Sequence, residues 1–447
     1  MLNMHGNKPA LAAAIVTLGS ICASFAWALD ISALDLPAPA TDADFLATTP
    51  AEVALGQLLF YDPVLSGNDN ISCSTCHHPK FGTSDGLSLG MGEGGVGLGP
   101  ARVFDPANVP EDRVPRNAPA LYNLGALEYT TMFHDGRVEM VDGQLHVPIE
   151  DPFFEQVNGI LATQAAFPVL SPDEMAGHVN ENPISKAVRK GRFSGEGGAW
   201  DLIASKVAAL PEYQTLFVAA YPDIATREIR FADISNAIAS FIAVEFRADN
   251  SPFDAVLRGD DTPLDPLAAA GMALFYGDAG CVECHSGTFQ TDHKFHAMGQ
   301  PQFGPGKTLP FEQGVRDEGR FRVTGKARDL YAFRTPSLRN VTLTAPYGHT
   351  GAYADLWEFV TAHSLPRAAF GAWSPEMAVL PAMDVEDWET WNDAREGAAI
   401  TDAIAVDDLR LSADDIDALV AFLGILTDDT PHLGVPDVVP SGLPFEK

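Results

Sequence analysis

The chain has 447 residues, of which 28 are Lys or Arg and 60 are Asp or Glu, so its formal net charge is -32. This acidic balance argues against binding to nucleic acids or to anionic membrane surfaces, which attract cationic proteins. The charge either steers a basic protein partner or serves solubility alone, and the length allows two or three domains.

The N-terminal segment has the pattern of a secretory signal peptide. Lys8 supplies a short charged region, residues 11–27 form an apolar stretch, and Ala26-Trp27-Ala28 fits a small-residue cleavage site. The apolar stretch is short for the alternative, a membrane anchor. We therefore expect residues 1–28 to be removed on export to the periplasm, with no membrane span in the rest of the chain.

A helix-like segment followed by a cysteine motif occurs twice, first at residues 51–60 and again at 266–275. In both, the string Leu-Phe-Tyr begins three residues after a glycine (Gly56 and Gly271), which is typical of a duplicated unit. Each leads into Cys-x-x-Cys-His, the attachment signature of a c-type haem, in which two thiols bond the porphyrin and the histidine ligates the iron. The motif residues are Cys73, Cys76 and His77, and then Cys281, Cys284 and His285. The fifth cysteine, Cys22, lies in the signal segment, so none remains for a disulfide.

The other predicted elements are mostly helices. Apolar residues recur at helical spacing over residues 200–220 and 229–246, and Ser412 is a suitable N-cap for a helix through Leu423. Asn250-Ser-Pro252 interrupts the pattern. We therefore expect a mainly α protein with two cytochrome c-like haem domains in tandem, at residues 29–250 and 251–447. Residues 366–410, with three tryptophans, fit no pattern and are either a partner surface or a packed insertion.

Long strings of residues surround the two haem motifs. In the first half these are Gly56-x-x-Leu59-Phe60-Tyr61-Asp62-Pro63, Ser84-Asp85-Gly86, Arg116-Asn117-Ala118-Pro119 and Phe133-His134-Asp135-Gly136-Arg137. In the second half they are Gly319-Arg320, Phe333-Arg334-Thr335-Pro336 and Ala345-Pro346-Tyr347-x-His349-x-Gly351. Together they resemble the bacterial dihaem cytochrome c peroxidase family, which includes MauG-like enzymes that oxidise tryptophans of a partner protein. The resemblance implies an oxidoreductase with two covalently bound c-type haems.

In this family the N-terminal haem reacts with hydrogen peroxide, so the resemblance makes His77 its proximal ligand. The family's distal pocket is matched by Gln164, Pro168 and Glu174. Glu174 would move a proton between the peroxide oxygens, Gln164 would orient the peroxide, and Pro168 would restrict the pocket. From the local sequence alone, we would expect Glu174 to be an exposed carboxylate at the start of a helix.

Two departures from the family pattern concern the first haem. Many members carry a histidine after Ser-Asp-Gly that closes the iron, whereas this chain has Gly90-Met91-Gly92-Glu93-Gly94. We expect a five-coordinate iron that needs no reductive activation, with Met91 as the alternative sixth ligand. The second departure is His134, where the family commonly has an inter-haem tryptophan. His134 is either a bridging residue or a structural histidine on the distal side.

At the second haem the resemblance makes His285 the proximal ligand and aligns His363 with the distal ligand, which is Met in peroxidases and Tyr in MauG-like enzymes. Met298 and His349 are alternative candidates for this distal ligand. A bis-histidine iron has a lower potential than a His/Met iron, which favours MauG-like chemistry. The family also holds calcium between its domains, and the matching oxygen donors belong to the Asn117 side chain and the carbonyls of Thr344 and Pro346.

The function expected from the sequence is a periplasmic peroxidase. Hydrogen peroxide would be reduced at the first haem, with electrons arriving through the second from a small cytochrome c or cupredoxin. One alternative is MauG-like oxidation of aromatic residues in a partner protein through a high-valent state. Another is a non-catalytic electron-transfer dihaem cytochrome.

Overall fold

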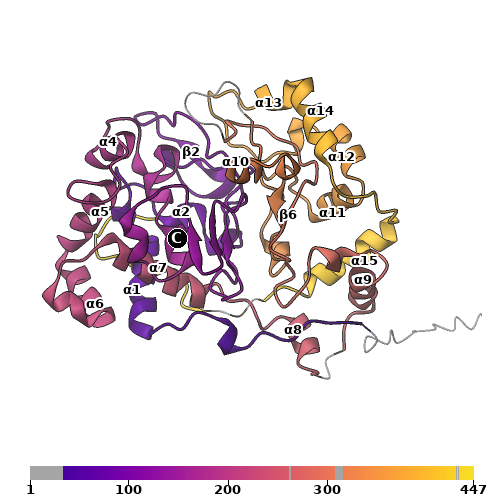
Figure 1. Cartoon of the computed structure of the whole chain (residues 1–447), viewed down its shortest axis with the longest axis horizontal. Coiled ribbons are helices and arrows are strands. Elements are labelled where there is room, and N and C mark those ends of the chain that lie inside the picture. The colour runs from indigo at the N-terminus through magenta and orange to yellow at the C-terminus, as the bar shows by residue number, and fades with distance from the viewer. Residues whose placement is uncertain (1–33, 261–262, 308–315, 429, 431) are drawn as a thin grey trace, which may run out of the picture.

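The computed structural model describes residues 34–260, 263–307, 316–428, 430 and 432–447. The predicted signal peptide (1–28) and Cys22 lie outside the described residues. The described chain is mainly helical, as expected, with only short strands. Figure 1 shows the first half on one side of the molecule and the second half on the other.

The helices of the first half are α1 (Pro50–Tyr61), α2 (Cys73–Cys76), α3 (Ile160–Ala165), α4 (Pro183–Arg189), α5 (Ala199–Ala208), α6 (Pro211–Ala220) and α7 (Phe231–Glu245). Those of the second half are α8 (Pro252–Leu257), α9 (Pro266–Tyr276), α10 (Phe321–Thr324), α11 (Leu356–Ser364), α12 (Pro366–Ala372), α13 (Glu389–Asn392), α14 (Ala394–Ala403) and α15 (Ala413–Gly424).

The strands form small antiparallel sheets between the helices. They are β1 (Gly95–Val96) with β2 (Val103–Phe104), β3 (Thr131–Met132) with β4 (Val138–Val141) and β5 (Gln144–His146), and β6 (Phe295–His296) with β7 (Phe333–Arg334). Strands of two to four residues cannot form a core, so the helices carry the fold.

Two equivalent helix pairs organise the two halves. In the first, Gly56 of α1 packs against Ala237 of α7, where a Cβ on the glycine would lie 1.9 Å from the Ala237 carbonyl oxygen. In the second, Gly271 of α9 packs against Ala418 of α15, and the corresponding distance is 1.8 Å. Only glycine permits so close an approach. The repeat predicted from the sequence is thus present as two similar helix contacts, each just before a cysteine motif.

Each helix pair has its own hydrophobic core, and each described end of the chain packs against the core of the opposite half. Leu34 and Leu36 pack against the second core, whereas Val439 is buried in the first. The backbone N–H groups of Leu433 and Gly434 both donate to the Glu245 carboxylate, at 2.8 Å each. The C-terminal tail is therefore fastened to the first half, although the sequence places it after the predicted boundary at residue 250.

A third core contains the tryptophan-rich segment. Trp373 is 4% exposed and stacks on Phe303, with ring centroids 5.4 Å apart and ring planes at 11°. Trp388 and Trp391 are partly buried against the same core. The tryptophans of residues 366–410 therefore belong to a packed insertion, the second of the two alternatives.

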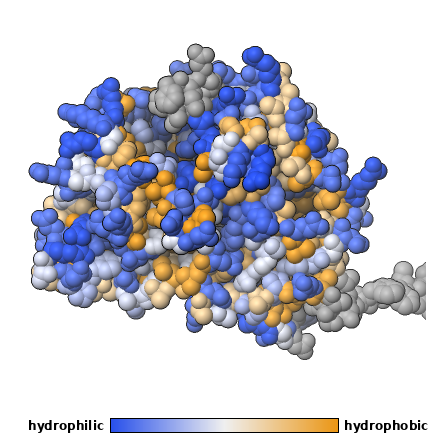
Figure 2. Space-filling model, in the orientation of Figure 1, coloured by the Kyte–Doolittle hydropathy of each residue, from blue (hydrophilic) through white to orange (hydrophobic). Residues whose placement is uncertain are grey.

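The surface seen in Figure 2 is mostly hydrophilic, with small scattered apolar patches, in keeping with the acidic composition. None of the helices in the described part of the chain is long and apolar enough to cross a membrane.

Candidate active site

The first cysteine motif forms one helical turn, α2, that ends at His77. The Nδ1 atom of His77 lies 3.0 Å from the carbonyl oxygen of Thr83, which fixes this nitrogen as the proton-bearing donor. The Nε2 lone pair is then free for a metal, the arrangement usual for metal-bound histidine. Burial raises the pKa of both Cys73 and Cys76 to about 12, so neither is an activated thiolate, and neither forms a disulfide.

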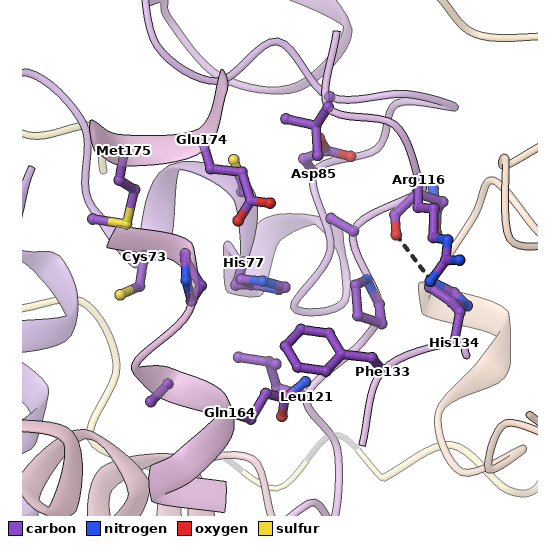
Figure 3. Close-up of a pocket in the computed structure, with 18 of the residues that line it drawn as sticks. Cys73, His77, Asp85, Arg116, Leu121, Phe133, His134, Gln164, Glu174 and Met175 are labelled. Atoms are coloured by element: carbon purple, nitrogen blue, oxygen red, sulfur yellow. Dashed lines mark hydrogen bonds between the residues drawn. The ribbon is translucent and has the colours of Figure 1, made fainter. Parts of the chain in front are cut away.

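A large cavity opens in front of His77. It encloses about 1180 Å³ of empty space, part of it open to solvent. Its lining brings together the first haem motif and all four residues for which the sequence predicts a catalytic role, namely Gln164, Pro168, Glu174 and His134. Figure 3 shows Glu174, Gln164 and His77 around this space. Segments that are about 100 residues apart in the sequence therefore meet at one site.

Glu174 sits on a π-helical turn, Pro172–Ala176, a rare element that is frequent at functional sites. Burial raises the pKa of its carboxyl group, while the charges of Lys307 and Arg137 and a hydrogen bond with the Ser171 side chain oppose the rise. The turn is held against the loop of residues 90–97, called the glycine-rich loop below, because the Glu93 N–H donates to the Asp173 carbonyl at 3.0 Å. Glu174 is thus a half-buried acid in the wall of the cavity, not the exposed carboxylate that its local sequence alone favours.

Hydrogen bonds from an arginine fix the conformation of the glycine-rich loop. The Arg102 guanidinium donates to the carbonyl oxygens of Met91 at 2.5 Å, Gly92 at 2.9 Å and Gly97 at 2.6 Å. Met91 itself is buried and, unlike Gly90, is not among the residues that line the cavity. The described lining contains no histidine other than His77 and His134.

His134 is half-buried and contacts both halves of the chain. Its Nε2 atom lies 3.1 Å from the Asn117 carbonyl oxygen, the contact drawn in Figure 3. Burial, followed by the nearby Arg116 charge, lowers the pKa of His134 to about 4, so the imidazole is neutral near pH 7. Its backbone carbonyl accepts a hydrogen bond from the Arg334 N–H at 2.8 Å. His134 therefore contacts the second half directly, as a bridging residue requires.

The second cysteine motif repeats the geometry of the first. His285 Nδ1 lies 3.1 Å from the Gln290 carbonyl oxygen, and His363 Nδ1 lies 3.0 Å from that of Phe359 on α11, so Nε2 of each imidazole is left for a metal. Burial, followed by the charge of His363, lowers the pKa of His285 to about 4. His349, one of the alternative ligands, stacks on Phe333 with ring centroids 3.7 Å apart, and neither of its ring nitrogens has a hydrogen-bond partner in the described structure.

A cluster of metal-binding type lies beside this motif, where one ligand atom each from Cys284, Asp292 and His296 falls within 4.8 Å of the others. The Cys284 sulfur belongs to the haem attachment motif, so the group that remains is the His296–Asp292 pair, at 3.1 Å.

The sequence did not predict every residue of the first cavity. Asp85, Arg137 and Lys307 also line it. Asp85 and Arg137 belong to the residue strings that carry the family resemblance, but the sequence predicts no role for either side chain. Burial raises the pKa of Asp85 to about 7. Lys307 lies in a Gly- and Pro-rich loop of the second half, for which no local pattern predicts a site.

These residues fit a covalently attached haem in each half. The paired thiols, the free Nε2 atoms of His77 and His285 and the large cavity are the features such a group requires. Arg334 fits a haem propionate, because this buried guanidinium has no carboxylate within 4.0 Å among the described residues and donates only to the carbonyls of Phe133 and Thr335, at 3.3 Å each. Arg339 does not, since it pairs with Asp254 at 2.7 Å.

One of the donors predicted for calcium, Asn117, is bound to the second half of the chain. The Asn117 N–H donates to the carbonyl of His349, three residues after Pro346, at 2.8 Å. The side-chain amide nitrogen of Asn117 donates to the Leu87 carbonyl at 2.7 Å, which leaves Oδ1 as the atom for a cation.

Fold and site together define a mainly helical protein with two c-type haem attachment sites, one of them facing a cavity that contains a half-buried acid. A family model described as di-haem cytochrome c peroxidase matches residues 50–262. The MauG methylamine utilization protein of Methylorubrum extorquens is 31% identical over 309 residues, covering 69% of this chain and 67% of that protein. The cytochrome c551 peroxidase of Pseudomonas aeruginosa is 29% identical over 354 residues, covering 77% of this chain and 82% of that protein.

Among solved structures, a MauG-like protein associated with microbial copper homeostasis is similar over 90% of this chain and 96% of its own, with 26% identity and a TM-score of 0.56. The diheme peroxidase BthA of Burkholderia thailandensis, at 21% identity and a TM-score of 0.57, shares the fold over 90% of this chain and 91% of its own. The chain therefore belongs to the di-haem cytochrome c peroxidase and MauG family. It is an oxidoreductase that carries two covalently bound c-type haems.

Proposed function

We propose that this protein reduces hydrogen peroxide at the N-terminal haem with electrons delivered through the C-terminal haem. The observation that carries the proposal is the single cavity lined by His77, Gln164, Pro168 and Glu174. The overall reaction consumes one H₂O₂, two electrons and two protons and yields two water molecules. The first haem, when bound, supplies the iron at which the O–O bond breaks.

The protein's own groups handle the protons in this proposal. In its charged form Glu174 accepts a proton from the peroxide oxygen nearer the iron and returns it to the far oxygen, which leaves as water. Gln164 orients the peroxide with its amide, and Pro168 limits the space beside it. The Arg102-anchored loop places neither a histidine nor Met91 in the cavity lining, so His77 alone would hold the iron of the first haem and the protein would need no reductive activation.

The second haem is proposed to have His285 and His363 as its axial ligands, with His134 between the two halves. The two domains (residues 29–250 and 251–447) would each hold one haem in tandem. Calcium at Asn117, Thr344 and Pro346 would fasten the halves together. Residues 1–28 would direct export, which places the protein in the periplasm with a small cytochrome c or cupredoxin as donor.

Optical and electron paramagnetic resonance spectra of the resting protein, followed by peroxide addition, test this proposal. We expect one high-spin ferric haem and one bis-histidine low-spin haem, with rapid spectral change on adding peroxide. Glu174→Gln should slow that change about 10²- to 10⁴-fold, as expected for loss of a general acid–base group. Two low-spin haems whose spectra do not change on adding peroxide would contradict the proposal and indicate a non-catalytic electron-transfer cytochrome.

A second candidate is MauG-like oxidation of aromatic residues in a partner protein. The matching geometry of His363 and His285 favours it, because each has Nδ1 bound to a backbone carbonyl and Nε2 left for a metal. A bis-histidine haem has a low potential and is a weak acceptor of electrons from an ordinary donor. Steady turnover with a reduced small cytochrome supports the peroxidase. A stable two-electron-oxidised protein that turns over no such donor supports the alternative.

A further inference from the structure

Lys307 is the only lysine among the described residues that line the first cavity. It comes from the second half of the chain, whereas the haem motif and Glu174 belong to the first. The cavity is therefore completed by a positive charge from the half that is proposed to deliver electrons.

The loop that carries Lys307 is fixed on several sides. The Gln302 side chain donates to the Asp317 carbonyl at 2.6 Å and accepts from the Asp317 N–H at 3.1 Å. Phe303 stacks on Trp373, and the Gly304 N–H donates to the Asp387 carbonyl at 2.6 Å. The tryptophan-rich insertion thus supports the loop and holds Lys307 at the cavity.

The other two cations of the cavity are already paired. Arg116 lies 2.7 Å from Asp135 and 2.6 Å from Asp317. Arg137 lies 3.1 Å from Asp135, with its guanidinium 3.5 Å from the centre of the Phe133 ring. No carboxylate oxygen of the described residues lies within 4.0 Å of the Lys307 ammonium group. Of the charges that act on Glu174, that of Lys307 has the largest effect, ahead of Arg137.

A buried carboxylate is neutral unless a charge or hydrogen bond stabilises its ionised form, and a neutral carboxyl group cannot accept a proton. We propose that Lys307 is a positioning residue of the peroxide cavity, whose ammonium group keeps the Glu174 carboxylate charged and ready to accept the proton. This inference rests on the role proposed for Glu174 above.

The neighbouring groups include acids as well as cations. Glu174 lines the cavity together with Arg137, Lys307 and Asp85, and the preceding residue in the chain, Asp173, is an acid whose pKa is raised by burial and in part by the Glu174 charge. Burial, followed by the charges of Arg137 and Arg116, lowers the pKa of Lys307 to about 8. Lys307 is therefore still mostly protonated at neutral pH, although burial weakens its charge.

Cyanide binding to the ferric holoprotein tests the inference without turnover. Hydrogen cyanide must lose its proton to a distal base before cyanide binds the iron, so the binding rate falls at low pH as that base is protonated. A nearby opposite charge lowers a carboxyl pKa by about 1–3 units, so removing it in Lys307→Met should raise the pKa of the base. The acidic limb should then move to higher pH. At pH values below the wild-type midpoint, cyanide binding should be roughly tenfold slower than in the wild type. Lys307→Arg, which keeps the positive charge, should have its acidic limb at the wild-type pH.

Two further variants make each failure distinguishable. Glu174→Gln should abolish the acidic limb in both backgrounds; a limb that survives there overturns the role of Glu174 itself. If Glu174→Gln abolishes the limb but Lys307→Met leaves it at the wild-type pH, the role of Lys307 is overturned, whatever happens to the amount of haem bound or the haem potential. Lys307→Gln repeats the uncharged test with a polar side chain, and Lys326→Met, at an exposed position of the same half, is the charge-matched control.

Discussion

Gly271 of α9 lies against the carbonyl of Ala418 on α15 so closely that a Cβ at position 271 would be 1.8 Å from that oxygen. The relationship recurs in the first half between Gly56 and Ala237, at 1.9 Å. In both contacts a phenylalanine four residues later on the partner helix, Phe422 or Phe241, closes over the glycine. The two haem motifs are therefore each presented by the same kind of helix crossing.

Gly271→Ala should destabilise the protein. Alanine ordinarily favours a helix by about 1 kcal/mol over glycine. At position 271 the helices must separate to admit the methyl group, and overpacking of this kind costs about 1–3 kcal/mol. The midpoint of thermal unfolding, followed by far-ultraviolet circular dichroism of the holoprotein, should therefore fall.

Gly371→Ala is the matched control, because α12 leaves open space around that glycine. Its midpoint should stay the same or rise slightly. Equal midpoints for Gly271→Ala and the wild type would show that the α9–α15 contact tolerates a side chain.

The sequence predicts the haem motifs, the helical class and the repeat, because each is carried by residues close together in the chain. Gln164, Pro168 and Glu174 were found through the family resemblance, since a glutamate after Ser171-Pro172 has no local mark of burial. Lys307 could not be found in this way. Its place at the cavity depends on Phe303 packing against Trp373, 70 residues further on, and no local pattern records that contact.

His363→Ala should disturb the low-spin haem specifically. Removing the proposed sixth ligand leaves that iron with His285 alone, and the low-spin ferric signal should be replaced by a second high-spin one. Electron paramagnetic resonance of the ferric protein measures both species. His432→Ala, which removes an exposed histidine whose Nε2 lies 3.2 Å from the Arg247 carbonyl oxygen, should leave the spectrum unchanged. An unaltered low-spin signal in His363→Ala would refute this ligand assignment.

Arg102→Gln should release the glycine-rich loop. The guanidinium makes three hydrogen bonds to loop carbonyls, and hydrogen bonds from a charged group are worth about 1.5–3 kcal/mol each. Amide hydrogen exchange in residues 90–97 should therefore become at least tenfold faster. Arg189→Gln, at an exposed position on α4, serves as control. Unchanged exchange in Arg102→Gln would mean that the glycine-rich sequence holds its conformation without the arginine.

The ion pair between Arg116 and Asp317 should make the stability of the protein depend on pH in acid. Burial opposes ionisation of Asp317, but the Arg116 charge and its hydrogen bonds outweigh burial and lower the pKa of Asp317 to about 2. Because the folded pKa lies below the model value of 3.8, this stabilisation is present above about pH 4 and is lost as the pH falls toward 2. The difference corresponds to roughly 2 kcal/mol.

Asp317→Asn should remove that part of the acid dependence and also destabilise the protein near pH 7. The expected loss is about 1.5–3 kcal/mol, the value of a hydrogen bond to a charged group, because Arg116 keeps its second partner, Asp135. Urea unfolding of the holoprotein at pH 3, 4 and 7 measures both effects. Asp437→Asn, which alters a fully exposed carboxylate, should follow the wild type at each pH. If Asp317→Asn kept the wild-type loss of stability between pH 4 and pH 3, the acid sensitivity would reside in other carboxylates, Asp135 first among them, since it is the other partner of Arg116.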